Sequence, residues 1–333
     1  MNRGRRAGEA KPPSEAAEPF PGPSRRGHMT RTPGRWPSIP RIAAGPRSVV
    51  RSRQGVQRSG ASRRRRPMPF TDAPGFRMHY VIRGDGPPLL LVNGMGSDLS
   101  EWLYQLPAFS RKHRVVAFDN RGAGESAVPE GPYTTAQMAD DAAALLAALG
   151  IPRAHLLGVS LGGMIAQEVA LRHPGRVERL VLACTALGGA LSVRPSPEAL
   201  AAFARDPSAD LEAQIRRTIP YLYTERYCRE KPEEVEAFVR RRLARPADAA
   251  GVAAQLVAAI GHAAGNRLAR IPAPTLVITG TEDRLVPPEN SRRIAERIPG
   301  SRLALFPGAP HRLFAENAEA FNREVLAFLD PGR

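Results

Sequence analysis

The pentapeptide Gly-Val-Ser-Leu-Gly at residues 158–162 constrains the fold of this chain more than any other segment. An apolar run precedes it at residues 155–159, and a helix-like run follows at residues 161–172. A serine between a strand and a helix in this pattern is typical of a sharp turn that lifts the hydroxyl above a sheet, in front of the helix N-terminus. Glycines leave room for such a turn, because a Cβ there would crowd the neighbouring backbone. The segment therefore predicts an exposed Ser160 where a strand ends.

The net charge of +16 is concentrated in the first 66 residues. They carry 17 Arg and Lys against 3 Asp and Glu, whereas residues 67–333 carry 31 against 29. The segment is rich in Pro, Gly, Ser and Arg and has no sustained apolar periodicity, so it cannot bury enough surface to offset its ordering entropy. We expect residues 1–66 to form a disordered tail, and residues 67–333 to form a globular part that binds no nucleic acid.

Three other interpretations of the tail stay open. Its charge alone would suit an arm that binds nucleic acid or an anionic membrane. Its Arg and Ser content would suit a transit peptide, although its prolines oppose an amphipathic helix. The favoured hypothesis is a misassigned start, because Met68 opens a segment that reads like the beginning of a domain. Arg outnumbers Lys 45 to 3, as is typical of GC-rich coding DNA, in which spurious upstream reading frames are common.

Cysteine use and hydropathy suggest the cellular setting. Neither Cys184 nor Cys228 has a partner at metal-ligand spacing, so we expect two reduced thiols and no metal. No run approaches 18 apolar residues, and the tail lacks the apolar core of a secretion signal. These features favour a cytoplasmic protein that contacts no membrane.

From residue 76 the chain alternates strand-like and helix-like segments. Apolar runs separated by helices predict βαβ units, and hence an α/β fold with a mostly parallel sheet covered by helices on both faces. The expected strands cover residues 78–83, 89–92, 115–118, 155–159, 180–184, 275–278 and 302–306. The expected helices cover residues 100–110, 134–149, 161–172, 289–298 and 318–328, with Ser100 and Asn317 as N-caps.

Residues 186–266 interrupt this alternation, because they carry only helical pattern between two strands of one sheet. The clearest helices are expected at residues 197–205, 232–245 and 249–262. The position of the insertion places it above the C-terminal ends of the strands, where α/β proteins bind ligands. We expect a helical cap over the site, on a core of residues 67–185 and 267–333; a helical insertion with only a packing role is the alternative.

His311 is the candidate base for Ser160, because a serine hydroxyl needs an adjacent base to act as a nucleophile. It lies in a loop just past the last expected strand, at the C-terminal edge of the sheet. His79 and His113 are expected near strand starts, on the opposite edge. His262 lies in the expected cap, where it could touch substrate.

Asp283 is the candidate acid that would orient this base. It lies in the loop after the strand at 275–278, on the same side of the sheet as His311. The adjacent Glu282 is the weaker alternative. Asp119 also ends a strand, but it precedes a turn-forming run and is expected only to support that loop.

A tetrahedral intermediate on Ser160 would need hydrogen-bond donors aimed at its oxyanion. The backbone N–H of Leu161, at the start of the helix, is one candidate. The other should come from the loop after the strand at 89–92, whose glycines allow close backbone approach. The N–H of Met95 is the choice there.

Together these segments resemble the α/β-hydrolase family, in the branch with a helical cap, over residues 68–333. The matching segments are GVSLG at 158–162, NGMG at 93–96, DNRGAG at 119–124, GTED at 280–283 and His311. Two positions depart from the family pattern. Asn93 stands where the oxyanion loop usually begins with His, but it keeps a hydrogen-bonding side chain that can brace the loop. Pro310 stands where glycine usually precedes the base, and it restrains Ala309.

The resemblance implies a serine hydrolase that cleaves a carboxylic ester or lactone through an acyl-enzyme on Ser160, without a cofactor. A serine nucleophile argues against haloalkane dehalogenase and epoxide hydrolase activity, which use aspartate in this family. Short matches at residues 162–165 and 184–186 look similar to enol-lactonases. A carbon–carbon bond hydrolase or a cofactor-free haloperoxidase or perhydrolase would use the same triad. A non-catalytic ligand-binding protein is the alternative from another class, which the intact triad disfavours.

The substrate would be a small molecule whose acyl and alcohol groups are selected by the cap. Candidate pocket residues are Asn93, Gly94, Trp102, Tyr221, Tyr223 and His262. Ordinary packing explains Trp102, Tyr221 and Tyr223 equally well.

Overall fold

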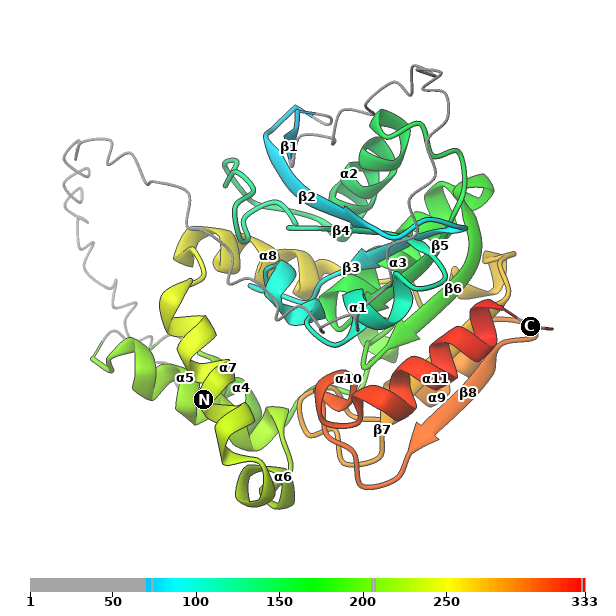
Figure 1. Cartoon of the computed structure of the whole chain (residues 1–333). Coiled ribbons are helices and arrows are strands. Elements are labelled where there is room, and N and C mark those ends of the chain that lie inside the picture. Colours follow the sequence, from blue (N-terminus) through cyan, green and yellow to red (C-terminus); the bar gives the residue numbers. More distant parts are fainter. Residues whose placement is uncertain (1–69, 73–74, 205, 207, 331, 333) are drawn as a thin grey trace, which may run out of the picture. The chain divides into compact units, whose positions relative to one another are not determined.

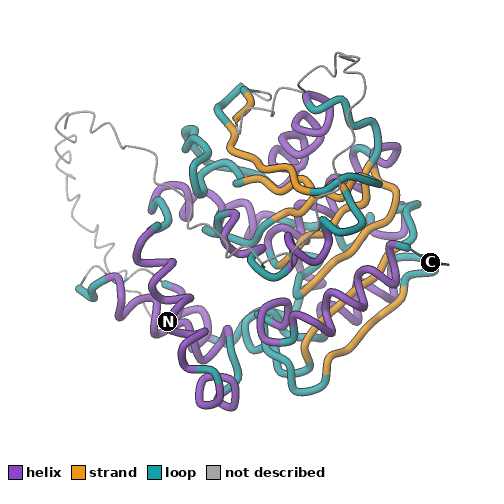
Figure 2. Tube along the Cα trace, viewed as in Figure 1, coloured by secondary structure: helices purple, strands orange, loops and turns teal. Residues whose placement is uncertain are grey.

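A computed structural model describes residues 70–72, 75–204, 206, 208–330 and 332. These residues form a sheet of eight strands with helices on both of its faces (Figures 1 and 2). The strand order across the sheet is β1-β2-β4-β3-β5-β6-β7-β8. The predicted tail, residues 1–66, lies outside the described residues.

Strands and helices alternate along much of the described chain. The strands are β1 (Phe70–Thr71), β2 (Met78–Arg83), β3 (Pro88–Val92), β4 (Arg114–Phe118), β5 (Ala154–Val159), β6 (Val177–Ala183), β7 (Thr275–Gly280) and β8 (Arg302–Phe306). The α-helices are α1 (Gln105–Phe109), α2 (Thr135–Ala148), α3 (Leu161–Arg172), α4 (Pro197–Phe203), α5 (Leu211–Leu222), α6 (Glu225–Glu230), α7 (Pro232–Ala244), α8 (Ala249–Gly261), α9 (Glu289–Arg297), α10 (Leu313–Glu316) and α11 (Ala318–Leu329). Short 3₁₀ helices are η1 (Leu99–Trp102), η2 (Pro174–Arg176), η3 (Gly189–Leu191) and η4 (Leu268–Arg270).

The order of the central strands determines where a ligand can enter. β3 to β8 run parallel, whereas β2 is antiparallel to both β1 and β4. The chain leaves β3 for β4 on one side and returns to β5 on the other, so the strand order reverses around β3. Crevices for ligands in such sheets lie beyond the carboxyl ends of the strands at this reversal. Val92 of β3 pairs with Gly158 of β5, so the two strands end side by side there.

Two apolar cores, one on each face, hold the sheet between its helices. Alternate residues of a strand point to opposite faces, as Leu89 and Leu90 of β3 illustrate. Leu90 packs in a cluster with residues of α2, α3 and α9, and Leu89 packs with residues of α1 and α11. Both residues are completely buried. Strands covered on both faces explain why their sequences are continuous apolar runs.

One of the two expected N-caps, Ser100, is wrong. The predicted helix 100–110 is split into η1 and α1, and Asp98, not Ser100, caps the first piece by accepting a hydrogen bond from the Ser100 N–H at 2.8 Å. Pro107 has no N–H and its ring opposes a helix carbonyl four residues earlier, which interrupts a continuous helix. Asn317 is the N-cap residue of α11, as expected, but its side chain makes no cap bond, because α10 runs directly into it.

The described residues between β6 and β7 contain five α-helices and no strand. Figure 1 shows α4 to α7 grouped beyond the ends of the strands, and α8 near α2. Sequence patterns missed α5, which carries Pro220 near its end, and α6, which has only six residues. No helix that the structure describes combines the length and apolar character needed to cross a membrane.

His262, which follows α8, joins this insertion to the core. Its ring is buried between the hydroxyl of Thr135, 3.0 Å from Nδ1, and the side-chain carbonyl of Gln167, 3.3 Å from Nε2. Glu168 and Arg267 are the charged groups beside it, and their effects on the ring oppose each other. Burial lowers the pKa of His262 to about 4, so the ring is neutral at pH 7.

A buried ion pair fixes the loop after β4. Arg121 donates two hydrogen bonds of 2.6 Å to Asp141 of α2, and both side chains are buried. Its guanidinium also lies over the rings of Phe76 and Tyr133. Burial raises the pKa of Asp141, but a buried carboxylate left without its cation is costly.

We predict that Arg121→Met lowers the free energy of unfolding by about 3–5 kcal/mol, because Asp141 would lose its partner in the interior. Arg172→Met is the matched control, since Arg172 pairs with Asp140 on the surface. The control should change stability by less than about 1 kcal/mol. Urea unfolding of both variants at pH 7 measures the difference, and equal effects would contradict the prediction.

We also predict that acid destabilises the junction at His262. The unfolded chain protonates this side chain near pH 6.5 and the folded protein only near pH 4, so its stabilising contribution is full above pH 6.5 and is lost as the pH falls through 4. The loss approaches about 3 kcal/mol. His262→Gln cannot titrate, so its free energy of unfolding should fall less than that of the wild type between pH 7 and pH 4.5. Parallel pH profiles would refute this assignment.

Candidate active site

Ser160 lies at the turn between β5 and α3, as the pentapeptide predicts. Its backbone has φ 56° and ψ −122°, a conformation that non-glycine residues rarely adopt. Hydrogen bonds hold it there: its N–H donates to Ala183 O at 3.0 Å. Its carbonyl accepts from the N–H groups of Gly163, at 2.9 Å, and Met164, at 3.3 Å, and from the Thr185 hydroxyl at 2.7 Å. The surrounding bonds therefore offset the strain of placing this side chain above the sheet.

The two glycines of the pentapeptide are required by close backbone approach. A Cβ at position 158 would lie 2.2 Å from the carbonyl oxygen of Gly162. A Cβ at position 162 would lie 2.1 Å from the carbonyl oxygen of Val92. Both distances are far below van der Waals contact, so larger residues would push α3 away from the sheet.

His311 and Asp283 meet at the same edge of the sheet. Nδ1 of His311 donates to Oδ2 of Asp283 at 2.7 Å, and both side chains are buried. The other oxygen of Asp283 accepts from the N–H groups of Leu285, at 3.0 Å, and Val286, at 2.7 Å. With the proton fixed on Nδ1, Nε2 of the imidazole is left as a proton acceptor. The neighbouring Glu282 is exposed instead.

The loops that carry this pair are bonded directly to each other. The Thr281 N–H donates to Phe306 O at 3.0 Å, and the Glu282 N–H donates to Ala309 O at 3.0 Å. The Gly308 N–H donates to the Thr281 hydroxyl at 2.8 Å. The ends of β7 and β8 thus form one rigid unit, although Pro310 stands where the family usually has glycine.

Cys184 connects the serine to this pair and was missed by sequence reasoning. It follows Ala183, which binds the Ser160 N–H, and its sulfur lies within 4.8 Å of ligand atoms of Asp283 and His311. Three such atoms could in principle hold a metal ion. Burial raises the pKa of the Cys184 thiol well above its usual value, so the arrangement fits a neutral thiol beside a hydrogen-bonded Asp–His pair better than a metal site.

The loop after β3, residues 93–98, is the candidate oxyanion loop and lies against Ser160. A Cβ on Gly94 would be 3.4 Å from Cβ of Ser160. The amide of Asn93 braces the loop by donating to Asp98 O at 3.0 Å, and Asn93 O accepts from the Asn120 side chain at 3.0 Å. The expected bracing by Asn93 is therefore present.

The serine hydroxyl and the proposed donors remain unengaged in the part of the chain that the structure describes. There, no hydrogen bond reaches the hydroxyl of Ser160 or Nε2 of His311, and no acceptor receives the N–H of Met95 or Leu161. Catalytic hydrogen bonds often tighten only when substrate binds. The arrangement can therefore serve nucleophilic attack on a carbonyl once a substrate brings these groups together.

Arg312, next to His311 in the sequence, anchors the base loop to the insertion and was also missed. Its guanidinium donates to Glu101 and, at 2.9 Å, to the hydroxyl of Tyr223, and it lies 4.4 Å from the ring centroid of Phe238. Its N–H donates to Leu222 O at 3.1 Å. Although burial opposes ionisation of Glu101, Arg312 lowers the pKa of that carboxyl.

The aromatic pocket candidates make packing contacts. Trp102 is fully buried and its ring centroid lies 6.2 Å from that of Phe314. Tyr221 packs on Phe203 and lies under the guanidinium of Arg284. Tyr223 is hydrogen-bonded to Arg312, and His262 is hydrogen-bonded to Thr135 and Gln167, as described above. No contact of Trp102, Tyr221, Tyr223 or His262 that the structure records reaches Ser160.

The prediction that His79 lies at the far edge of the sheet is wrong. Because β2 is antiparallel to β4, the beginning of β2 lies beside the end of β4. There, Nδ1 of His79 donates a hydrogen bond to Asp119 at 2.7 Å. Asp119 also accepts from the N–H groups of Leu99, at 2.8 Å, and Glu125, at 2.9 Å. All these contacts brace loops, which agrees with the supporting role expected of Asp119.

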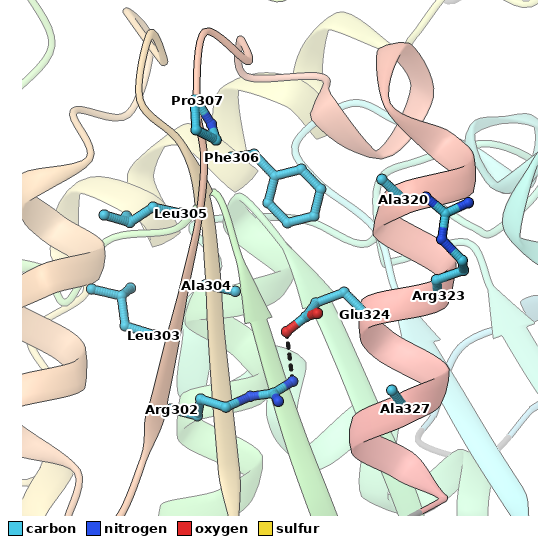
Figure 3. A pocket seen from close by; sticks show the side chains of 10 residues that line it. All are labelled: Arg302, Leu303, Ala304, Leu305, Phe306, Pro307, Ala320, Arg323, Glu324 and Ala327. Carbon is cyan, nitrogen blue, oxygen red and sulfur yellow. Dashed lines mark hydrogen bonds and ion pairs between the residues drawn. The ribbon is translucent and has the colours of Figure 1, made fainter.

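A surface groove of about 610 Å³ lies away from this arrangement, between β8 and α11 (Figure 3). Its side chains are mostly apolar, and Arg302 bonds to Glu324 across it at 2.5 Å. None of Ser160, Asp283 and His311 lines it. The groove therefore plays no part in the candidate site.

Comparisons with known proteins agree with this geometry. The family model described as the alpha/beta hydrolase fold matches residues 87–318. A Variovorax paradoxus protein named "Putative carbamate hydrolase RutD" is 36% identical over 258 residues, which cover 76% of this chain and 96% of that one. The 3-oxoadipate enol-lactonase 2 of Acinetobacter baylyi is 32% identical, over 76% of this chain and 92% of the relative. The crystal structure of the enol-lactonase from Burkholderia xenovorans LB400 superposes with a TM-score of 0.69 at 32% identity, over 78% of this chain and 99% of that one. The chain belongs to the α/β-hydrolase family.

Proposed function

We propose that this hydrolase cleaves a carboxylic ester or lactone through an acyl-enzyme on Ser160. The observation that carries the proposal is the 2.7 Å hydrogen bond from His311 to Asp283, whose other oxygen accepts from two backbone N–H groups. This pair lies at the edge of the sheet where β5 ends and Ser160 follows. This bond leaves Nε2 of the base free to take a proton. A nucleophile, a base and its orienting acid are the parts that acyl transfer requires.

The mechanism follows from these positions. Ser160 Oγ attacks the carbonyl carbon while Nε2 of His311 takes its proton, and Asp283 stabilises the resulting imidazolium. The oxyanion would accept hydrogen bonds from the N–H groups of Leu161 and Met95, each worth about 10²–10³ in rate. His311 then returns the proton to the leaving oxygen, and the acyl-enzyme remains. Water, deprotonated by the same base, attacks the ester carbonyl, and the acid leaves as Ser160 recovers its proton.

The relatives support a carbonyl substrate with a heteroatom leaving group. They include proteins named as an enol-lactonase, a carbamate hydrolase and a poly(3-hydroxyalkanoate) depolymerase. A carbamate is the second candidate, because the relative with that name is 36% identical. A carbon–carbon bond hydrolase stays the alternative with the same triad, as a meta-cleavage product hydrolase is 26% identical with a TM-score of 0.68.

We predict that the protein hydrolyses p-nitrophenyl acetate and butyrate, and that Ser160→Ala lowers kcat by at least about 10³-fold. A fluorophosphonate should label the wild type once, at Ser160, as mass spectrometry of the digested protein can show. Ser208→Ala, an exposed serine of the cap, is the matched control and should keep full activity and labelling. Absence of both hydrolysis and labelling in the wild type would refute the proposal.

We further predict that Asp283→Asn lowers kcat by about 10²–10⁴-fold, because the amide would favour the wrong tautomer of His311. Glu282→Gln should leave kcat unchanged, since Glu282 is exposed. Steady-state kinetics on the same esters measures both. The reverse ranking would assign the orienting role to Glu282.

A panel of lactones, carbamates and diketones, run with both variants, then identifies the substrate class.

A further inference from the structure

The N–H and the carbonyl of Gly96, in the candidate oxyanion loop, are both bonded to the helical insertion. Its N–H donates to Oε1 of Gln255 in α8 at 2.8 Å. Its carbonyl accepts from the Arg242 guanidinium of α7 at 2.8 Å. The partners lie 159 and 146 residues away in sequence, so the cap, not the loop's own neighbours, fixes this residue.

Gln255 is built into the interior rather than resting on a surface. Its side chain is completely buried, and its Nε2 donates to Arg121 O, in the loop after β4, at 2.7 Å. Both ends of the amide are therefore used, which fixes its orientation. Val252 of α8 would lie 3.0 Å from a Cβ on Gly96, so the helix packs directly on this residue.

Met95 lies between two anchors. On its N-terminal side, the residue Asn93 is bonded to Asp98 and Asn120. On its C-terminal side, Gly96 is held only through Gln255 and Arg242 among the contacts described. The bonds within the loop are long: the N–H of Ser97 donates to Gly94 O at 3.4 Å, and the Ser97 hydroxyl donates to Met95 O at 3.4 Å. Gly96 has φ +62° and Gly94 also lacks a Cβ, so the shorter bonds from the insertion contribute most to holding this segment.

We propose that Gln255 and Arg242 are positioning residues that aim the Met95 N–H at the developing oxyanion. This inference rests on the proposed serine hydrolase function. The cap then does more than cover the site: the oxyanion hole is complete only while α7 and α8 are docked on the loop. Such residues affect the transition state, where negative charge develops, more than the bound substrate.

The kinetic test compares four variants of the full-length chain. Gln255→Met and Arg242→Met remove the bonds to Gly96 while keeping most of the side-chain volume. Arg242→Lys keeps a donor, and Arg240→Met is the control on an exposed side chain of the same helix. We expect each of the first two to lower kcat about 10- to 100-fold with little change in KM, because a donor misplaced by about 1 Å can cost about 10²-fold. Arg242→Lys should recover most of the loss, and Arg240→Met should behave as wild type.

A boronic acid that forms a tetrahedral adduct with Ser160 gives an independent measure. Its inhibition constant should rise in Gln255→Met by the same factor by which kcat/KM falls. The double variant of Gln255 and Arg242 should lose less than the product of the two single losses, because both side chains act on the same residue, Gly96. Unchanged kcat would overturn the inference, and a change in KM alone would show that the cap contributes only to substrate binding.

Hydrogen exchange separates this inference from the proposed function. The peptide that covers residues 93–98 should exchange faster in Gln255→Met than in Arg240→Met, while peptides of β5 and β6 exchange alike. This readout needs no activity, so it holds even if no ester is cleaved. Equal exchange in the two variants would refute the bracing itself, whereas fast exchange in an enzyme that neither cleaves esters nor labels would refute the proposed function alone.

Discussion

The close packing of α3 on the sheet is the constraint on which the rest of the site depends. Gly162 brings the first turn of α3 to the carbonyl of Val92, at a distance that leaves no room for a Cβ. This contact fixes the helix N-terminus beside the end of β3, and with it the backbone of Ser160 and the N–H of Leu161. It also determines that the loop after β3 runs past the serine, because Val92 and Gly158 are paired. One backbone contact thus positions both the candidate nucleophile and the loop proposed to bind its oxyanion.

The second half of the site depends on hydrogen bonds between loops rather than on a helix. The loops after β7 and β8 are joined through Thr281 and Glu282, and this joint brings Asp283 to His311. Arg312 links these loops, by hydrogen bonds, to Glu101 and to Tyr223 of the insertion. A buried Arg with aromatic rings around it can lose neither its charge nor its partner cheaply. The position of the base is therefore coupled to packing well outside the reacting atoms.

Much of the fold could be predicted from the sequence, because buried parallel strands are short apolar runs. The pentapeptide was also informative, because the turn has no room for a Cβ at either of its glycines. Strands such as β2 and β8 lie where the patterns put them. The candidate acid and base were identifiable because chain order and strand ends place both residues at one edge. The failures have distinct physical causes. Pro107 interrupts a helix that the residues around it favour. β2 runs antiparallel to β4, so His79 at the start of β2 lies at the edge of the sheet opposite to the one predicted. Gln255 and Arg242 leave no local signal, because their partner is more than a hundred residues away.

The different attachments of the cap helices have a consequence for how such enzymes can diversify. α8 is fixed by Gln255 to two core loops, and His262 at its end is fixed to α2 and α3. α4 packs mainly on α5, and α5 also packs on α7 and bonds to the core through Leu222 at its end. Substitutions in α4 and α5 can therefore change this part of the insertion without disturbing the loop that holds Met95. We expect sequence variation among hydrolases with this arrangement to concentrate in α4 and α5, while the buried face of α8 changes little.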